Sequence, residues 1–199
     1  MKKIALGLLL CLAPVVVAAA PLKIVNVSAP AINCVFNLTC TVTVNDTSDD
    51  VTLSTGGRGF LQSRTFSGFP GAPADGLFAY EYRLDLRNAV GATAISCIDS
   101  MTINFGPVVS TLDFNSDRKP DQVFVITNGG IGTTGIAAAI QTSNIKFIFA
   151  SPICEGGAPG KGDSSFFWGL VSENPPKLAD AALHEPGGVI RHVKVRVPR

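Results

Sequence analysis

The chain has 199 residues, with 16 basic and 15 acidic side chains and a formal net charge of +1. This length is enough for one domain with a sizeable hydrophobic core, and no second domain is required. The basic and acidic residues are mixed along the chain, which argues against the concentrated basic patch that nucleic acid or an anionic membrane surface requires.

The N-terminal segment MKKIALGLLLCLAPVVVAAA has the features of a secretory signal peptide. Two lysines precede an apolar stretch that is shorter than the ~20 residues needed to cross a bilayer, and small residues follow it. We predict cleavage between Ala19 and Ala20, so that residues 1–19 are the signal peptide and residues 20–199 form a single domain without a membrane span. The predicted location is therefore secreted or periplasmic.

Four cysteines follow the signal peptide, and an even number in an exported chain predicts two disulfides rather than a zinc site. Cys34 and Cys40 lie in INCVFNLTCTVTVN, where apolar residues alternate. On one extended strand these two cysteines would lie about 20 Å apart, too far to bond. A reversal of the chain between them would bring them together with the smallest loop to close. We favour Cys34–Cys40 with Cys97–Cys154, and the other two pairings remain open.

Strand-like segments recur along the rest of the chain and are separated by turn-forming residues. Residues 79–87, AYEYRLDLR, alternate Tyr80, Tyr82, Leu84 and Leu86 with charged residues, which predicts a strand with one face in the core and one in water. This pattern predicts an all-β fold, a single antiparallel β-sandwich of Ig-like or jelly-roll type with two disulfides and long Gly/Pro loops. The other predicted strands are LKIVNVS, TVTVN, FLQSRTF, AISCIDSMTINF, QVFVIT, IKFIFA and the C-terminal valines.

Three further segments are predicted to be something other than strands. NDTSDD, residues 45–50, consists of turn-forming residues. AAAIQTS, residues 137–143, and KLADAALHE, residues 177–185, are expected to form at most a helical turn or two. Neither has the length of a crossover helix, so a parallel α/β sheet is not expected.

The segment LDFNSDRKPDQVFVIT, from Leu112 to Thr127, has oxygen-bearing side chains at alternate positions. Calcium binds six to eight oxygens, and a loop with this spacing can curl around the ion. Arg118 stands where such loops usually have a glycine with positive φ, at a cost of about 1 kcal/mol. The alternative is a loop of Asx turns, in which Asp and Asn side chains accept hydrogen bonds from backbone N–H groups. The predicted calcium ligands are the side chains of Asp113, Asn115, Asp117 and Asp121 and the carbonyl of Lys119.

This segment resembles the calcium loop of FG-GAP and VCBS repeats, a DFNGDG-type loop followed by an aspartate and a β-strand. The resemblance implies calcium binding by the same five residues, but it occurs once and does not imply the propeller that those repeats build. Separately, VFVITNGGIGTTG and GKGDSSFFWGLVSENPP resemble segments of exported bacterial β-rich proteins that often carry a C-terminal PEP-CTERM sorting tail. This chain ends in VPR without the apolar anchor of that tail. The second resemblance implies export and a β-rich domain.

Three aromatic residues, Phe166, Phe167 and Trp168, are adjacent in the sequence. Successive side chains of a strand point to opposite faces, so both faces of this strand need a cover. We therefore expect Trp168 to be buried in a strand covered on both sides. The alternative is that Trp168 or Phe167 is exposed as a stacking platform for an extracellular glycan, as in a carbohydrate-binding module.

Catalytic motifs are sparse in this sequence. Ser164 or Ser165 could form a hydrolase triad with His184 or His192, because triads are defined by geometry rather than by spacing, but no G-x-S-x-G motif is present. His184, Glu185 and His192 could gather a metal, but H-E-x-x-H is absent. We therefore predict a secreted, non-catalytic binding or structural module stabilised by calcium, with an extracellular glycan or a surface protein as its partner. The alternatives are a carbohydrate-binding module and a secreted serine hydrolase.

Overall fold

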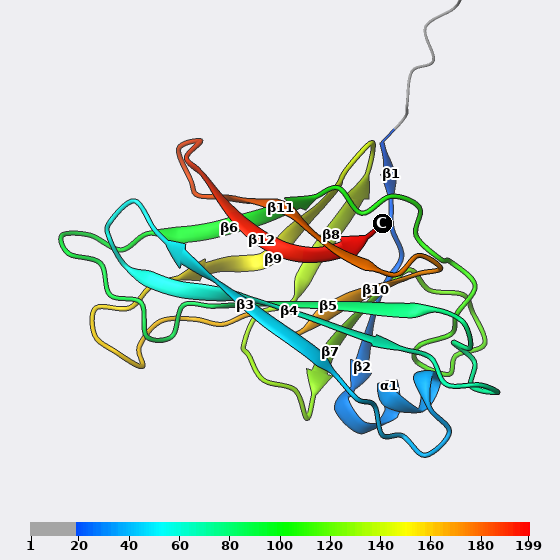
Figure 1. Ribbon diagram of the computed structural model, residues 1–199. Helices are drawn as coiled ribbons and strands as arrows, with labels where there is room; N and C mark the ends of the chain where they lie inside the picture. The colour runs from blue at the N-terminus through cyan, green and yellow to red at the C-terminus, as the bar shows by residue number, and fades with distance from the viewer. Residues whose placement is uncertain (1–18) are drawn as a thin grey trace, which may run out of the picture.

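The computed structural model describes residues 19–199, so residues 1–18 of the predicted signal peptide lie outside the described part. The described chain forms two stacked six-stranded sheets and one short helix (Figure 1), which confirms the predicted all-β sandwich. Within residues 19–199, no helix combines the length and the apolar character that a membrane crossing requires.

The first sheet is antiparallel throughout. In spatial order its strands are β1 (Ala20–Pro21), β8 (Ile136–Gln141), β9 (Ile145–Cys154), β6 (Cys97–Ile103), β11 (Pro176–His184) and β12 (Ile190–Pro198). The strands of the second sheet, in spatial order, are β2 (Ile24–Ser28), β7 (Val123–Asn128), β10 (Trp168–Ser172), β5 (Phe78–Asp85), β4 (Arg58–Ser67) and β3 (Asn45–Thr52).

The second sheet is mixed rather than purely antiparallel, because β2 runs parallel to β7. The other pairs of this sheet are antiparallel. A hairpin forces antiparallel pairing, but β2 and β7 are far apart in the chain and no short turn dictates their direction. The carboxyl ends of β2 and β7 consequently meet at the same edge of the sheet.

Apolar side chains from both sheets form one layer between them. Trp168 lies in this layer with only 1% of its surface exposed, which confirms its predicted burial. Its ring centroid is 6.0 Å from that of Tyr82, 5.8 Å from that of Phe147 and 5.4 Å from that of Phe149. An aromatic ring enclosed in this way offers no face to a sugar.

The outer face of the second sheet is also covered. Helix α1 (Ala29–Phe36) packs on this face, and the ring of Phe36 meets that of Phe66 edge-on at 4.8 Å. Phe167 points into this outer layer and is 3% exposed, whereas Trp168 points between the sheets. The three adjacent aromatic residues thus lie where both faces of the sheet are covered, as predicted. The outer cover includes Ile32, Val35, Phe36, Leu112 and Phe114.

The charged face of β5 was predicted to be in water, and this prediction is wrong. Glu81, Arg83 and Asp85 are 4%, 6% and 4% exposed. Arg83 lies 3.1 Å from Asp85, and the guanidinium of Arg87 lies 2.6 Å from the same carboxylate. The outer cover and the side chains of the neighbouring strands enclose the face that the alternation assigned to solvent.

Both disulfides form in the favoured pairing, Cys34–Cys40 and Cys97–Cys154. The first joins Cys34 of α1 to Cys40 and closes the segment that follows the helix. Residues 34–36, which the sequence analysis read as part of a strand-like alternation, are helical. Pro30 stands at the start of this helix, where its missing N–H is not needed and its fixed φ suits the first turn. The second bond joins directly opposite residues of β6 and β9.

Four other local predictions are wrong. Residues 45–50 belong to β3 rather than to a turn, while residues 41–44, predicted as a strand, are irregular. Residues 137–141 and 177–184 lie in β8 and β11 rather than in helical turns. The three segments that form strands are each held by a neighbouring strand, because tertiary pairing overrides weak local preference.

Polar side chains of β3 and β4 form hydrogen bonds with β12, at the edge where the two sheets meet. The carboxylate of Asp49 accepts a hydrogen bond from the backbone N–H of Lys194 in β12 at 2.6 Å. The hydroxyl of Ser63 in β4 accepts one from the N–H of Arg196 at 2.9 Å. These bonds satisfy edge groups of β12 that would otherwise be open to pairing with another chain.

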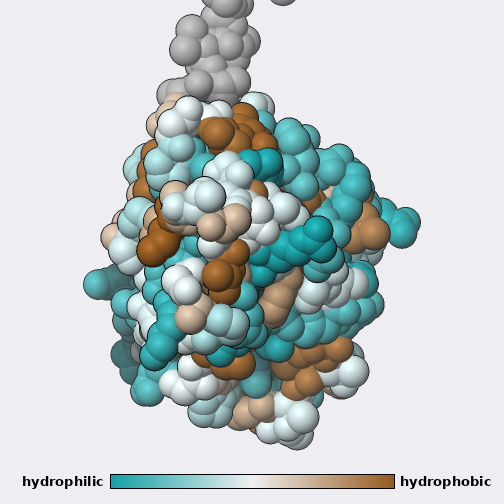
Figure 2. Space-filling view, turned by 90° about the vertical axis from the view of Figure 1, so that its left-hand side faces the viewer, coloured by the Kyte–Doolittle hydropathy of each residue, from teal (hydrophilic) through white to brown (hydrophobic). Residues whose placement is uncertain are grey.

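The surface of the described chain mixes the two kinds of side chain. On the face that Figure 2 shows, hydrophobic residues form small scattered groups between hydrophilic ones. Single exposed apolar residues of this kind are ordinary on protein surfaces. Function is therefore better sought in loops and hollows than in a broad apolar face.

Candidate functional site

The predicted calcium loop projects from the outer cover of the second sheet. Its base is an isolated antiparallel bridge, in which the N–H of Asp121 donates to the carbonyl of Leu112 at 2.7 Å. The side chain of Leu112 is buried in the outer cover, and β7 begins directly after the base, at Val123. The loop is thus anchored by apolar packing on one side and by a strand on the other.

Three of the predicted ligand side chains turn towards the inside of this loop. The carboxylate of Asp113 accepts hydrogen bonds from the backbone N–H groups of Asp117 at 3.1 Å and Arg118 at 2.6 Å. The side-chain oxygen of Asn115 accepts from the N–H of Asp117 at 3.1 Å. Asp117 in turn accepts from the N–H of Lys119 at 2.8 Å. Asp113, Asn115 and Asp117 are therefore brought together, and the exposed Lys119 follows them.

The backbone of the loop is left-handed at Arg118, the position where calcium loops of this kind usually have a glycine. This residue has a φ of +64°, and Ser116 has a φ of +63°. Both are left-handed conformations, which cost a residue with a side chain about 1 to 2 kcal/mol. The tight curl of the loop requires this backbone strain. Although desolvation raises the pKa of Asp117, the hydrogen bonds from Lys119 N–H and Asn115 outweigh it and lower that pKa.

Asp121 differs from the other predicted ligands because it is completely buried. One carboxylate oxygen accepts a hydrogen bond from the N–H of Phe114 at 3.0 Å. The other lies 2.8 Å from the ammonium of Lys23, which also donates to the carbonyl of Pro120 at 3.3 Å. The hydrogen bond to Asp121 is the main cause of a raised pKa at Lys23. Lys23 thus supplies a positive charge at the base of the loop.

Within residues 19–199, no group of three or more His, Cys, Asp or Glu side chains already has the arrangement of a metal site. The present positions of Asp113 and Asp117 are set by their bonds to backbone amides, and that of Asp121 by Lys23. These bonds match those of Asx turns, the alternative to calcium.

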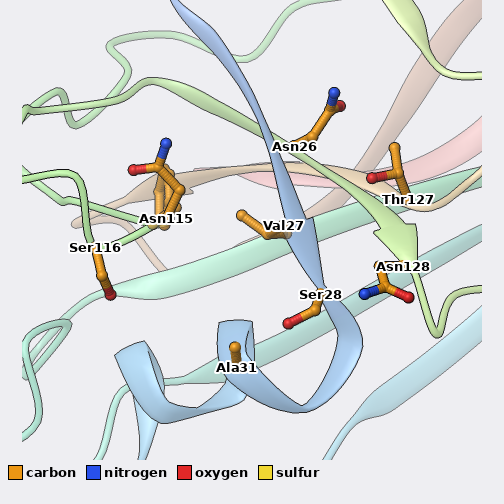
Figure 3. Close-up of a pocket in the computed structure, with 9 residues that line it drawn as sticks. Asn26, Val27, Ser28, Ala31, Asn115, Ser116, Thr127 and Asn128 are labelled. Carbon is orange, nitrogen blue, oxygen red and sulfur yellow. The ribbon is translucent and has the colours of Figure 1, made fainter.

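A polar hollow of about 290 Å³ adjoins this loop (Figure 3). Asn115 and Ser116 contribute one side of it, and Ala31 of α1 lies below. The remaining polar groups come from the carboxyl ends of the parallel strands β2 and β7. Amide and hydroxyl groups both donate and accept hydrogen bonds, so the hollow suits a neutral polar ligand. The polar lining residues that the sequence analysis missed are Asn26, Ser28, Ser116, Thr127 and Asn128.

The candidate sugar-stacking rings are not available at the surface. Trp168 and Phe167 are 1% and 3% exposed. The guanidinium of Arg64 lies 4.0 Å above the ring of Phe167 and covers that face. Stacking of a glycan on either ring is therefore excluded by burial.

The candidate hydrolase residues form hydrogen bonds within the fold instead of a catalytic triad. Ser164 and Ser165 are buried, and both hydroxyls donate to the carbonyl of Leu84, at 3.2 Å and 3.4 Å. The ring of His184 instead makes a hydrogen bond of 3.0 Å with Thr102. A nucleophile has to reach its substrate, and these two hydroxyls are enclosed in the sheet.

Glu185, a candidate metal ligand, is committed to other partners. Its carboxylate accepts hydrogen bonds from Ser54, Ser96 and Arg191, the last at 2.6 Å. Burial alone would raise the pKa of Glu185, but these hydrogen bonds lower it to about 2. This carboxylate ties two loops to the end of β11 rather than joining His184 and His192 around an ion.

No protein-family model matches the chain, and comparison with curated proteins and with solved structures gives no significant match. Function is therefore inferred from the geometry of the loop, the hollows and the buried polar groups.

Proposed function

We propose that the protein is an exported, non-catalytic binding or structural module whose loop at residues 113–121 is stabilised by calcium. The observation that supports this best is the curl of the loop, with Arg118 in the left-handed conformation and the oxygens of Asp113, Asn115 and Asp117 turned inward. Calcium prefers carboxylate, amide and carbonyl oxygens in a flexible shell, and this loop offers all three.

Export is supported by three independent features. Two disulfides suggest an oxidising compartment, outside the cell or in the periplasm. The N-terminal segment has the composition of a signal peptide. The resemblance of VFVITNGGIGTTG and GKGDSSFFWGLVSENPP to exported bacterial proteins of the PEP-CTERM-associated kind points the same way.

A binding or structural role is favoured over hydrolysis by the burial of Ser164 and Ser165. For a glycan, the hollow beside the loop is a better candidate than the buried aromatic rings, because its amide and hydroxyl groups match sugar hydroxyls. The other proposed binding partner is a surface protein.

The calcium proposal is tested by thermal melting in chelator and in millimolar calcium. Bound calcium stabilises the folded state by RT ln(1 + [Ca]/Kd), about 2.7 kcal/mol at a hundredfold excess over Kd. Magnesium should substitute poorly because it demands a tighter octahedral shell. A melting temperature that is the same in chelator and in calcium would show that the loop is a set of Asx turns that does not bind calcium.

Variants separate calcium binding from the loop's own hydrogen bonds. Asp113→Ala also removes acceptors for the N–H groups of Asp117 and Arg118, so each variant is compared with itself in chelator. The calcium-dependent shift should vanish in Asp113→Ala and in Asp117→Ala. It should persist in Lys119→Ala, because only the carbonyl of that residue is a proposed ligand.

A further inference from the structure

A second hollow, also about 290 Å³, opens on the outer face of the second sheet beside α1. Ala29 and Asn33 line it from one face of the helix, whereas Ala31, which lines the polar hollow, lies on the opposite helix face. The two hollows therefore flank α1. The walls of this second hollow are mainly apolar and comprise Val42, Val44, Phe66, Ile126, Ile131 and Phe167.

Glu81 of β5 also lines this hollow and is only 4% exposed. In the part of the chain that the structure describes, its carboxylate accepts no hydrogen bond and forms no ion pair. Burying a carboxylate without a partner is costly, and buried charges in proteins are normally paired. Glu81 is therefore a charge without a partner at the wall of an apolar hollow.

The nearest cation compensates this carboxylate only in part. Arg64, the cross-strand neighbour of Glu81 on β4, also lines the hollow. Its Nε donates to Asp46 at 3.0 Å, and its guanidinium lies over the ring of Phe167 at 4.0 Å. Asp46 lies outside the lining but is ion-paired with Arg64, so the charges of Arg64, Asp46 and an ionised Glu81 sum to −1.

We propose that this hollow binds a small primary alkylamine, with its ammonium group on Glu81 and its alkyl chain against the apolar walls. A volume of about 290 Å³ lies at the lower end of the range for ligand pockets, which suits a small molecule. An ammonium offers three donors and the opposite charge to the carboxylate. A carboxylate ligand would be repelled by Glu81, and a neutral alcohol would leave its charge uncompensated.

This inference deepens the proposed binding function and rests on it, but it does not depend on the calcium loop. Calcium-dependent melting tests the loop, and amine titration tests the hollow beside α1. Either test can fail without affecting the other.

Binding should depend on pH through Glu81. Burial raises the pKa of Glu81 to about 7, Arg64 lowers it and Asp46 raises it. Arg83, 5.3 Å from the ring of Phe167, and its ion-pair partner Asp85 are further charges on this face of β5, while α1 contributes none. The protonated carboxyl has no charge to offer an ammonium, so the apparent Kd should fall about 30-fold between pH 5.5 and pH 8.

The test is calorimetric titration of the purified protein at pH 8 with n-hexylammonium, 1-hexanol and hexanoate. Hexylammonium should bind at least tenfold more tightly than hexanol, and hexanoate should bind least. Equal binding of the amine and the alcohol, or no binding of the amine at millimolar concentration, would overturn the proposal.

Three variants complete the test. Glu81→Gln should weaken amine binding at least tenfold, abolish its pH dependence and leave hexanol binding unchanged, which also shows that the hollow is intact. Glu173→Gln, at an exposed glutamate outside this hollow, is the matched control and should bind as the parent does. Val44→Phe should weaken the binding of both hexylammonium and hexanol, because the larger side chain would fill part of the hollow. Amine binding that survives Glu81→Gln would refute the role of the carboxylate.

Discussion

Two glutamates of this protein illustrate how the surroundings of a residue set its charge. Glu185 is buried, but hydrogen bonds from Ser54, Ser96 and Arg191 keep it ionised, with a pKa of about 2. Glu81 is equally buried and has no such donors, so desolvation dominates and its pKa rises to about 7. The difference lies in the donors around each carboxylate, as expected when desolvation and hydrogen bonding compete.

The raised pKa of Glu81 predicts that the stability of the protein depends on pH through this residue. The folded protein holds this proton up to about pH 7, whereas the unfolded chain releases it near pH 4.5. The contribution of Glu81 to stability should therefore fall as pH rises from 4.5 to 7, with no further loss from this group above that range. Glu81→Gln removes the titration, so the variant should match the parent at pH 4 and exceed it by about 3 kcal/mol at pH 8.

Urea unfolding of both proteins at pH 4 and pH 8 checks this prediction. Taking the difference between variant and parent cancels the titration of the other carboxyl groups. A difference that is the same at both pH values would show that the folded environment does not disfavour the Glu81 carboxylate.

At the scale of single elements, β10 depends on one glycine. Gly169 lies between its partners in β5 and β7. A Cβ added there would lie 2.8 Å from the carbonyl oxygen of Tyr80 and closer still to the ring of the buried Phe124. Neither neighbour has room to move, because one is backbone in the sheet and the other is a packed ring.

We predict that Gly169→Ala lowers the free energy of unfolding by about 1 to 3 kcal/mol, the usual cost of overpacking a core. Gly157→Ala is the matched control, because a Cβ there meets nothing within 4 Å and its φ is not left-handed. Denaturant unfolding of the two variants should separate them. Equal stability of both would mean that β10 can shift to accept the methyl group.

For the whole molecule, the two disulfides differ in the length of chain that each closes. Cys97–Cys154 spans 57 residues and joins β6 to β9, whereas Cys34–Cys40 spans 6 and closes only the segment after α1. In the chain-entropy model the stabilisation grows with the logarithm of loop length, giving about 4 kcal/mol for the long loop and about 2 kcal/mol for the short one.

We therefore predict that replacing both Cys97 and Cys154 by serine lowers the melting temperature more than replacing both Cys34 and Cys40. Differential scanning calorimetry of the two double variants under non-reducing conditions measures this. The reverse order would show that local strain or residual structure in the unfolded chain, rather than loop closure, controls the effect.

Several features of the candidate site could be predicted from the sequence because they are local. The left-handed backbone at Arg118 follows from its position within a tightly curled Asx-rich loop. The inward oxygens of Asp113 and Asn115 follow from their alternate spacing. The polar hollow could not be predicted in the same way, because it requires β2 and β7 to be parallel neighbours.

By itself, the sequence determined the all-β class, most of the strands, the presence of two disulfides and the burial of Trp168, and it favoured the disulfide pairing that the structure shows. These depend on alternation, turn residues, cysteine count and loop closure, which are properties of short stretches. Only the tertiary structure decided that the polar segment 45–50 is a strand and that Glu81 lies in an apolar hollow. The physical reason is that alternation shows which side chains share a face of a strand, whereas the layer packed on that face decides whether they meet water or protein.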